Sequence, residues 1–330
     1  MKNIAIIGAG AWGTALAMVA RRAGRNVVLL AHEPEVADAV NEACENSLFL
    51  PGVALDPEIR ATNDPGEAAA DADAVLLAVP AQFLRAVLSG LSGDLPSGAP
   101  LVICAKGIEQ GTLALISEVA GEVVPQAPVA VLSGPTFAAD VALDRPTAVT
   151  LASADEALGA GLSEALGTPR FRIYRSDDIV GTQVGGAVKN VLAIGCGIVE
   201  GRGLGDNAKA ALITRGLAEI VRLGLAKGAK AETLMGLSGI GDLVLTCNAM
   251  QSRNFSLGVA LGQGEALDAI LAARTSVAEG VFSAASVSEL AANLSVDMPL
   301  SVAVDGILNH FADIDATIEG LLARPAGAEQ

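Results

Sequence analysis

The sequence predicts an α/β protein in which a doubly wound N-terminal domain, residues 1–182, precedes an all-helical C-terminal domain, residues 183–330. In the N-terminal half, short apolar runs alternate with segments of helical length, the pattern of buried parallel strands joined by crossover helices. After about Thr182 the strand-like runs stop, and stretches rich in Ala, Leu and Gly continue at helical spacing. The length of 330 residues also favours two hydrophobic cores over one.

Seven apolar runs are expected to form the strands of one sheet. They cover residues 4–7, 27–30, 74–79, 101–104, 129–132, 148–151 and 171–174. Crossover helices are expected over residues 14–23 and 82–91, whose length and periodicity suit a βαβ series.

The C-terminal half is expected to pass directly from the sheet domain into a helix, without a flexible linker. The periodicity predicts helices over residues 185–199, 207–227, 256–261, 267–273, 283–294 and 300–311. Residues 324–330 are expected to be frayed.

Composition excludes several classes of protein. The net charge is -16, so a nucleic-acid surface, which needs clustered Lys and Arg, is not expected. An anionic ligand must therefore be held by a local group of cations. No run reaches the roughly 18 apolar residues of a membrane span, so no membrane insertion is expected. The four cysteines are far apart and lack neighbouring histidines, which predicts neither disulfides nor a metal site and favours a cytoplasmic location.

Gly8, Gly10 and Gly13 form a GxGxxG motif between the first expected strand and the first helix. Such glycines allow a tight turn, a close approach of backbone to a pyrophosphate, and close packing of helix on strand. We therefore expect a Rossmann-type domain that binds NAD or NADP. Glu33, at the end of the second strand, suits a ribose diol, whereas the neighbouring His32 suits a 2'-phosphate, and the choice stays open.

A dehydrogenase needs a group that exchanges the proton accompanying hydride transfer. Histidine is poorly placed, because His32 belongs to the cofactor half and His310 lies near the C-terminus. Tyr174 has no lysine three or four residues later. Lys189, in contrast, lies in an apolar helix of small residues and should be buried, which suits a general acid/base. The plainer alternative is a lysine that extends to the surface.

Other polar residues occur where ligands gather. Lys106 follows an expected strand at its carboxyl end, the ligand edge of an open α/β sheet. Arg253 and Asn254 could hold a phosphate through charge-assisted hydrogen bonds. Asp242, in a Gly-rich stretch, could hold Lys189 and tune its charge. Taken one at a time, such residues are more often ordinary loop residues.

The combined motifs resemble bacterial NAD(P)-dependent glycerol-3-phosphate dehydrogenases over nearly the whole chain. The matching stretches are GAGAWGTALA from Gly8, FLPG from Phe49, AVPAQFLR from Ala78, KGIE from Lys106, SGPTFAADVA from Ser133, GGAVKNVLAIGCGIVEG from Gly185, GIGDLVLTC from Gly239, SRNF from Ser252 and VAEG from Val277. The first stretch alone would be shared with unrelated dehydrogenases.

The resemblance implies interconversion of sn-glycerol 3-phosphate and dihydroxyacetone phosphate, a role in glycerophospholipid synthesis, and a homodimer. It implies Lys189 as the acid/base, with Lys106 and Asp242 also in the catalytic group. The implied substrate contacts are Lys106, Gly134, Thr136, Lys189, Asp242, Ser252, Arg253 and Asn254. The implied cofactor contacts are Gly8, Gly10, Ala11, Trp12, Gly13, His32, Glu33, Lys106, Ala138, Arg253, Val277 and Glu279. His32, where the family often has arginine, and Asp140, in place of a usual glutamate, depart from the pattern.

Two rival hypotheses remain at this point. One is another lysine-using enzyme of the same architecture, such as a β-hydroxyacid or 2-dehydropantoate reductase, against which Arg253 and Asn254 favour a phosphorylated substrate. The other is a nucleotide sensor without turnover, which Lys106, Lys189 and Asp242 together disfavour.

Overall fold

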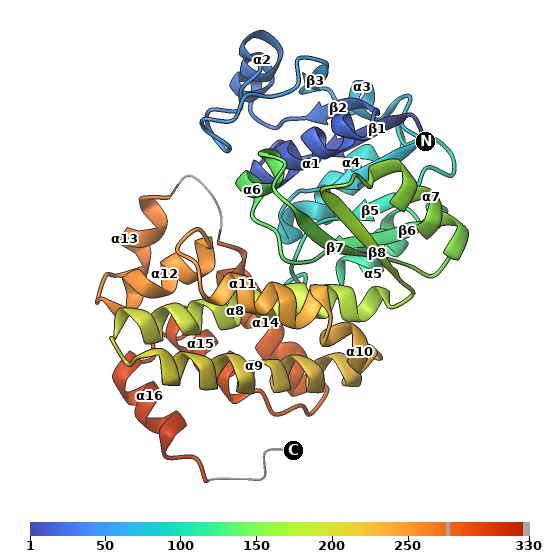
Figure 1. Ribbon diagram of the computed structural model, residues 1–330. Helices are drawn as coiled ribbons and strands as arrows, with labels where there is room; N and C mark the ends of the chain where they lie inside the picture. The colour runs from blue at the N-terminus through green and yellow to red at the C-terminus, as the bar shows by residue number, and fades with distance from the viewer. Residues whose placement is uncertain (275–277, 326–330) are drawn as a thin grey trace.

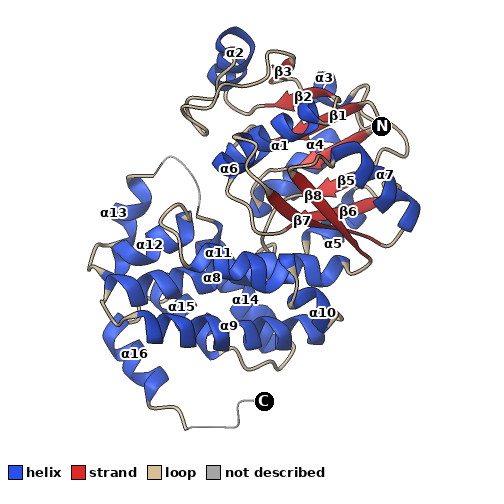
Figure 2. Ribbon diagram, in the orientation of Figure 1, coloured by secondary structure: helices blue, strands red, loops and turns tan. Residues whose placement is uncertain are grey.

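The N-terminal domain is built on one eight-stranded sheet of strand order β3-β2-β1-β4-β5-β6-β7-β8 (Figures 1 and 2). The structure, a computed structural model, describes residues 1–274 and 278–325. Neighbouring strands are parallel except β6 and β7, which are antiparallel. The strands are β1 (Asn3–Ile7), β2 (Asn26–Leu30), β3 (Ile59–Thr62), β4 (Ala74–Leu77), β5 (Leu101–Ile103), β6 (Val129–Ser133), β7 (Thr147–Ser153) and β8 (Phe171–Ser176).

Helices cover both faces of this sheet, which confirms the doubly wound prediction. Side chains alternate along β1: Ile4 and Ile6 pack into one core, Ala5 and Ile7 into the other. Helices α1, α6 and α7 lie on the first face, and α3, α4 and α5 on the second. The helices of this domain are α1 (Ala11–Arg22), α2 (Pro34–Ala43), α3 (Pro65–Ala69), η1 (Ala81–Phe83), α4 (Leu84–Leu91), α5 (Ile116–Val123), α6 (Ala138–Ala142) and α7 (Glu156–Leu166).

The seven predicted strands are confirmed, and the structure adds one that was not predicted. Strand β3 contains only two apolar residues, Ile59 and Ala61, alternating with the polar Arg60 and Thr62. It is an edge strand that pairs with β2 alone, so it needs no continuous apolar run.

The described residues of the C-terminal domain form helices joined by loops, with no strand among them. Its helices are α8 (Ile179–Gly201), α9 (Asp206–Ala226), α10 (Ala231–Leu234), the π-helical turn η2 (Leu237–Gly241), α11 (Asp242–Cys247), α12 (Arg253–Gly262), α13 (Leu267–Ala272), α14 (Glu279–Asn293), α15 (Pro299–Asn309) and α16 (Ile314–Leu322). Residues 326–330, most of the tail expected to be frayed, lie outside the described part of the chain.

Helix α8 forms the centre of this domain, with α9, α11, α12, α14 and α15 packed around it (Figure 1). Among the described helices, it is the one long and apolar enough to cross a membrane, yet 89% of its most apolar window is buried inside the protein. It is therefore a core helix. Its N-terminus is capped by Asp178, which accepts a hydrogen bond of 2.8 Å from the Gly181 N–H.

Helices α8 and α12 contact each other backbone to backbone. A side chain at Gly197 would overlap the carbonyl oxygen of Phe255, and one at Gly258 would overlap that of Ile194. Gly201 and Gly262 repeat the arrangement one turn later. This close packing places the first turn of α12 beside Asn190, the residue that follows Lys189 on α8.

Candidate active site

Two lysine ammonium groups share one buried carboxylate between the domains. Lys189 donates to Oδ1 of Asp242 over 2.9 Å, and Lys106 donates to Oδ2 over 2.7 Å. Asp242 is fully buried and Lys189 is 6% exposed. The sequence-based expectation that Lys189 is buried and held by Asp242 is thus matched by the geometry.

Each member of this group comes from a different segment. Lys189 lies in the middle of α8, and Lys106 follows β5 at the carboxyl edge of the sheet. Asp242 is the first residue of α11, directly after the widened turn η2. Gly186 of α8 lets the Lys106 stem lie close, since a Cβ there would stand 3.3 Å from Lys106 Cγ. The site therefore depends on how the two domains pack.

Burial lowers the pKa of Lys189 to about 8. The Asp242 carboxylate opposes this shift, and the nearby Lys106 ammonium adds to it. An ordinary lysine would stay fully charged near neutral pH, whereas this one can both give and accept a proton there. The two ammonium groups and one carboxylate leave the site with a net positive charge, which favours an anionic ligand.

Lys106 also fixes the loop that follows β6. Its ammonium donates to the carbonyl oxygen of Gly134 over 2.9 Å and to Thr136 Oγ1 over 3.5 Å. Gly134 has a φ of +151°, and a side chain there would overlap the backbone of Val149. Gly134 and Thr136, both implied as substrate contacts, thus lie within reach of the lysine pair.

The first turn of α12 is linked to the Lys106 segment through Asn190, whose side-chain amide donates to the carbonyl oxygen of Lys106 over 3.1 Å. Ser252 caps the helix by accepting from the Phe255 N–H over 3.2 Å, and Arg253 is exposed. The macrodipole and the guanidinium together suit a phosphate. Asn254 instead uses its amide within the protein: it donates to Asn190 Oδ1 over 2.9 Å and accepts from the Gly280 N–H over 3.0 Å.

Two polar residues at the site were not foreseen. Thr246 Oγ1 accepts from Lys189 over 2.7 Å, and it stands one helical turn after Asp242 on α11. Asn46 Nδ2 donates to the carbonyl oxygen of Ala9 and to Thr14 Oγ1, both over 2.8 Å, and so braces the glycine turn. The spacing of Asp242 and Thr246 could have indicated the first, whereas nothing in the local sequence marks Asn46.

The glycine turn between β1 and α1 fits a dinucleotide. Gly8 has a φ of +107°, and a side chain at Gly13 would overlap the carbonyl oxygen of Gly8. At Gly10, in contrast, an added Cβ would meet no protein atom within 4 Å, which leaves room for a pyrophosphate. The buried indole N–H of Trp12 has no hydrogen-bond partner among the described residues, a donor left for a ligand.

The other implied cofactor residues follow β2 or begin α6. His32 is exposed and Glu33 partly buried, both just past β2, and Ala138 begins α6, which packs on α1. Val277 lies outside the described residues.

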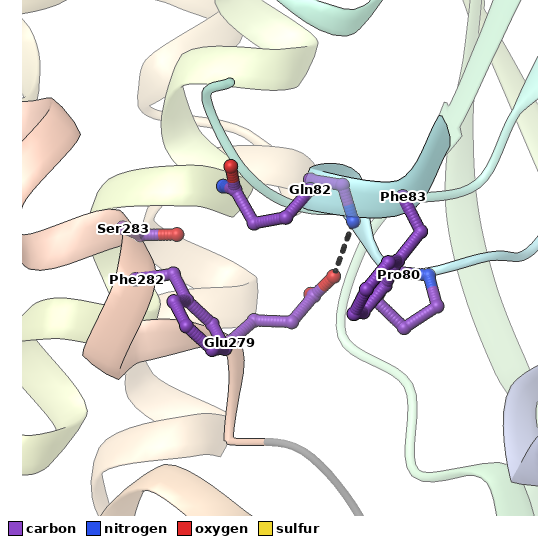
Figure 3. A pocket seen from close by; sticks show the side chains of 7 residues that line it. Pro80, Gln82, Phe83, Glu279, Phe282 and Ser283 are labelled. Atoms are coloured by element: carbon purple, nitrogen blue, oxygen red, sulfur yellow. Dashed lines mark hydrogen bonds between the residues drawn. The ribbon is translucent and has the colours of Figure 1, made fainter. Parts of the chain in front are cut away.

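Glu279, the first residue of α14, bridges the domains: its carboxylate accepts from the Ala81 N–H over 3.1 Å (Figure 3). Burial raises its pKa above the usual value. A cavity of about 10 Å³, the size of one water molecule, lies here, lined by Pro80, Ala81, Gln82, Phe83, Glu279, Phe282 and Ser283.

Alanine at Gly10 and at Gly13 should give opposite results. Gly10 has ordinary extended backbone (φ -66°), so Gly10→Ala should leave stability near wild type but weaken NADH binding by about tenfold, because the methyl group enters the open space. Gly13→Ala should lower the melting temperature, because its methyl group overlaps Gly8. Quenching of Trp12, the single tryptophan, measures binding, and thermal unfolding measures stability. Equal loss of stability in both variants would contradict this assignment.

The fold and site define a two-domain, dinucleotide-dependent dehydrogenase with a buried lysine pair on one carboxylate. Two family models match the chain: the N-terminus of NAD-dependent glycerol-3-phosphate dehydrogenase over residues 3–159, and the C-terminus over residues 178–319. The chain belongs to the NAD(P)-dependent glycerol-3-phosphate dehydrogenases, which confirms the resemblance seen in its sequence.

Individual relatives agree over the full length. The glycerol-3-phosphate dehydrogenase [NAD(P)+] of Rhodospirillum rubrum is 61% identical over 99% of this chain and 94% of its own. That of Parvibaculum lavamentivorans is 56% identical over 99% and 98%. The crystal structure of glycerol-3-phosphate dehydrogenase from Coxiella burnetii superposes with a TM-score of 0.94 at 39% identity, covering 98% of this chain and 99% of that one.

Proposed function

We propose that this chain interconverts sn-glycerol 3-phosphate and dihydroxyacetone phosphate, with NAD or NADP as cofactor. The observation that carries the proposal is the pair Lys106 and Lys189 on one carboxylate. The exposed Arg253, at a helix N-terminus, belongs to the same site, because its charge and those of both lysines act on the carboxylate of Glu279. A proton-exchanging lysine and an anion site in the same region suit a small phosphorylated alcohol. Family membership supports the same substrate.

Lys189 acts as the general acid/base in this proposal. As ammonium it donates a proton to the carbonyl oxygen of the ketone, and as neutral amine it accepts the proton of the secondary hydroxyl. Asp242 orients both lysines, and Lys106 stabilises negative charge that develops on the substrate oxygen. Arg253 and the N–H groups of the first turn of α12 hold the phosphate.

The dinucleotide would be held by the turn at Gly8, Gly10 and Gly13, by Trp12, and by Glu279 across the cleft. When bound, its nicotinamide ring gives or takes the hydride. Glu33 and His32 would face the adenosine ribose, which follows the end of the second strand in such domains.

Further proposals concern the whole protein. We take residues 1–182 as the dinucleotide-binding domain and residues 183–330 as the substrate domain; the boundary falls in the first turns of α8 and is supported by the two family matches. A cytoplasmic location accords with the free state of all four cysteines. A homodimer and a role in glycerophospholipid synthesis follow from the resemblance.

One assay tests substrate class and cofactor choice together. Purified protein is given dihydroxyacetone phosphate with NADH or with NADPH, and absorbance at the reduced nicotinamide band is followed. Oxidation of at least one cofactor is expected, with no comparable turnover of 2-dehydropantoate under the same conditions, or of 3-hydroxy acids when the oxidised cofactor is supplied instead. Turnover of those acids without turnover of dihydroxyacetone phosphate would refute the proposed substrate, and no turnover at all would favour a nucleotide sensor.

A further inference from the structure

Arg274, just beyond α13, reaches back to the first turn of α12. Its guanidinium donates to the carbonyl oxygen of Arg253 over 2.7 Å and to Ser256 Oγ over 3.2 Å. Ser256 Oγ itself donates to the same carbonyl oxygen over 3.3 Å. One side chain thus ties together residues 253 and 256, the turn that carries the proposed phosphate site.

The two guanidinium groups at this contact have no ion-pair partner among the described residues; Glu279 acts on Arg253, and Glu265 on Arg274, only at longer range. Among residues 1–274 and 278–325, no carboxylate oxygen lies within 4.0 Å of the guanidinium of Arg253 or Arg274. Burial and the positive charge of Arg253 both lower the pKa of Arg274, and the more distant Glu265 opposes them. Two guanidinium groups that repel each other in an otherwise acidic protein gain stability when an anion binds between or beside them.

We propose that Arg274 is a positioning residue for the substrate's phosphate group. The inference deepens the proposed function and rests on it. By binding the Arg253 carbonyl oxygen and Ser256 together, Arg274 holds the first turn of α12 in one conformation, so that its N–H groups and the Arg253 side chain meet the phosphate without prior ordering. Its own charge adds to the attraction. No residue of the proton-transfer group touches it, so its effect should fall on substrate binding.

The test replaces Arg274 by methionine, which keeps a long stem but removes the charge and both hydrogen bonds. Arg222→Met is the matched control, because Arg222 also docks on a backbone carbonyl oxygen, that of Asp297, over 3.0 and 2.8 Å from two of its nitrogens, but on α9. Arg274→Met should raise the KM for dihydroxyacetone phosphate by about tenfold and change kcat by less than about twofold. The control should leave KM unchanged.

Binding of inorganic phosphate gives a second readout, and it can be measured whether or not dihydroxyacetone phosphate is the substrate. Calorimetric titration of wild type should show phosphate binding that weakens in Arg274→Met in parallel with KM and stays intact in Arg222→Met. An unchanged KM and phosphate affinity in Arg274→Met, or an equal rise of KM in Arg274→Met and Arg222→Met, would overturn the inference.

If Arg274→Met does not fold, Arg274→Lys is used instead. It should raise KM by a smaller amount, and a KM equal to that of wild type would overturn the inference. Failure of wild type to use dihydroxyacetone phosphate would instead count against the proposed function, while phosphate affinity still decides the role of Arg274.

Discussion

Replacing Lys189 by alanine is expected to lower kcat by at least about a hundredfold while dinucleotide binding stays close to wild type. The loss follows because general acid/base groups contribute on the order of 10²–10⁴ to rate, and the proposed function gives the proton transfer to Lys189. Lys189 lies in the helical domain, away from the glycine turn, so the affinity for NADH should survive. Steady-state kinetics and Trp12 fluorescence measure the two effects separately.

The pH dependence of kcat/KM provides a second test of the role of Lys189. With a pKa of about 8, Lys189 is protonated below pH 8 and neutral above it. Reduction of the ketone needs the acid, so its kcat/KM should fall as pH rises through about 8. Oxidation of the alcohol needs the base, so its kcat/KM should rise through the same interval. Lys227→Ala, which removes a partly buried lysine that is paired with Glu118 far from Asp242, should reproduce the wild-type profile. Wild-type kcat in Lys189→Ala would assign the proton transfer to another group.

Asp242→Asn is expected to reduce both stability and activity. It leaves two ammonium groups without their shared counter-charge, and breaking a buried ion pair from one side costs about 3–5 kcal/mol of unfolding free energy. The pKa of Lys189 should fall further, because Asp242 is the main group that raises it against burial. The limb of the pH profile for ketone reduction should therefore move to lower pH, and kcat at neutral pH should drop.

Urea unfolding and pH profiles check this second prediction. Asp297→Asn is the control, since it removes an exposed carboxylate paired with Arg324 and should cost less than about 1 kcal/mol. The double variant Lys189→Met with Asp242→Asn should be destabilised by less than the sum of the two single changes, because it removes one of the stranded charges. Additive losses would mean that Lys189 and Asp242 are not coupled.

Much of the architecture could be predicted because buried parallel strands leave apolar runs in the sequence. Strand β3 could not, because an edge strand can be short and half polar. The antiparallel pairing of β6 with β7 could not be predicted either, because strand direction depends on the path of the intervening chain and not on the composition of the strands.

The site shows the same limit. Lys189 was recognisable because a charge inside an apolar helix needs an explanation. Its sharing of Asp242 with Lys106 was not, because the three residues lie far apart in sequence and meet only through the packing of the two domains. Thr246 was overlooked because a threonine in a helix has many ordinary reasons to be there.

The glycine contact between α8 and α12 fixes the distance between the two helices that carry Lys189 and Arg253. Lys189, the proposed partner of the reacting oxygen, is on one helix, and Arg253, the proposed partner of the phosphate, is on the other. Because the two backbones touch at Gly197 and Gly258, there is no layer of side chains that can compress or swell between them. Under the proposed contacts, main-chain atoms set the distance between the reacting oxygen and the phosphate, and a longer or shorter phosphorylated alcohol would require a whole helix to move.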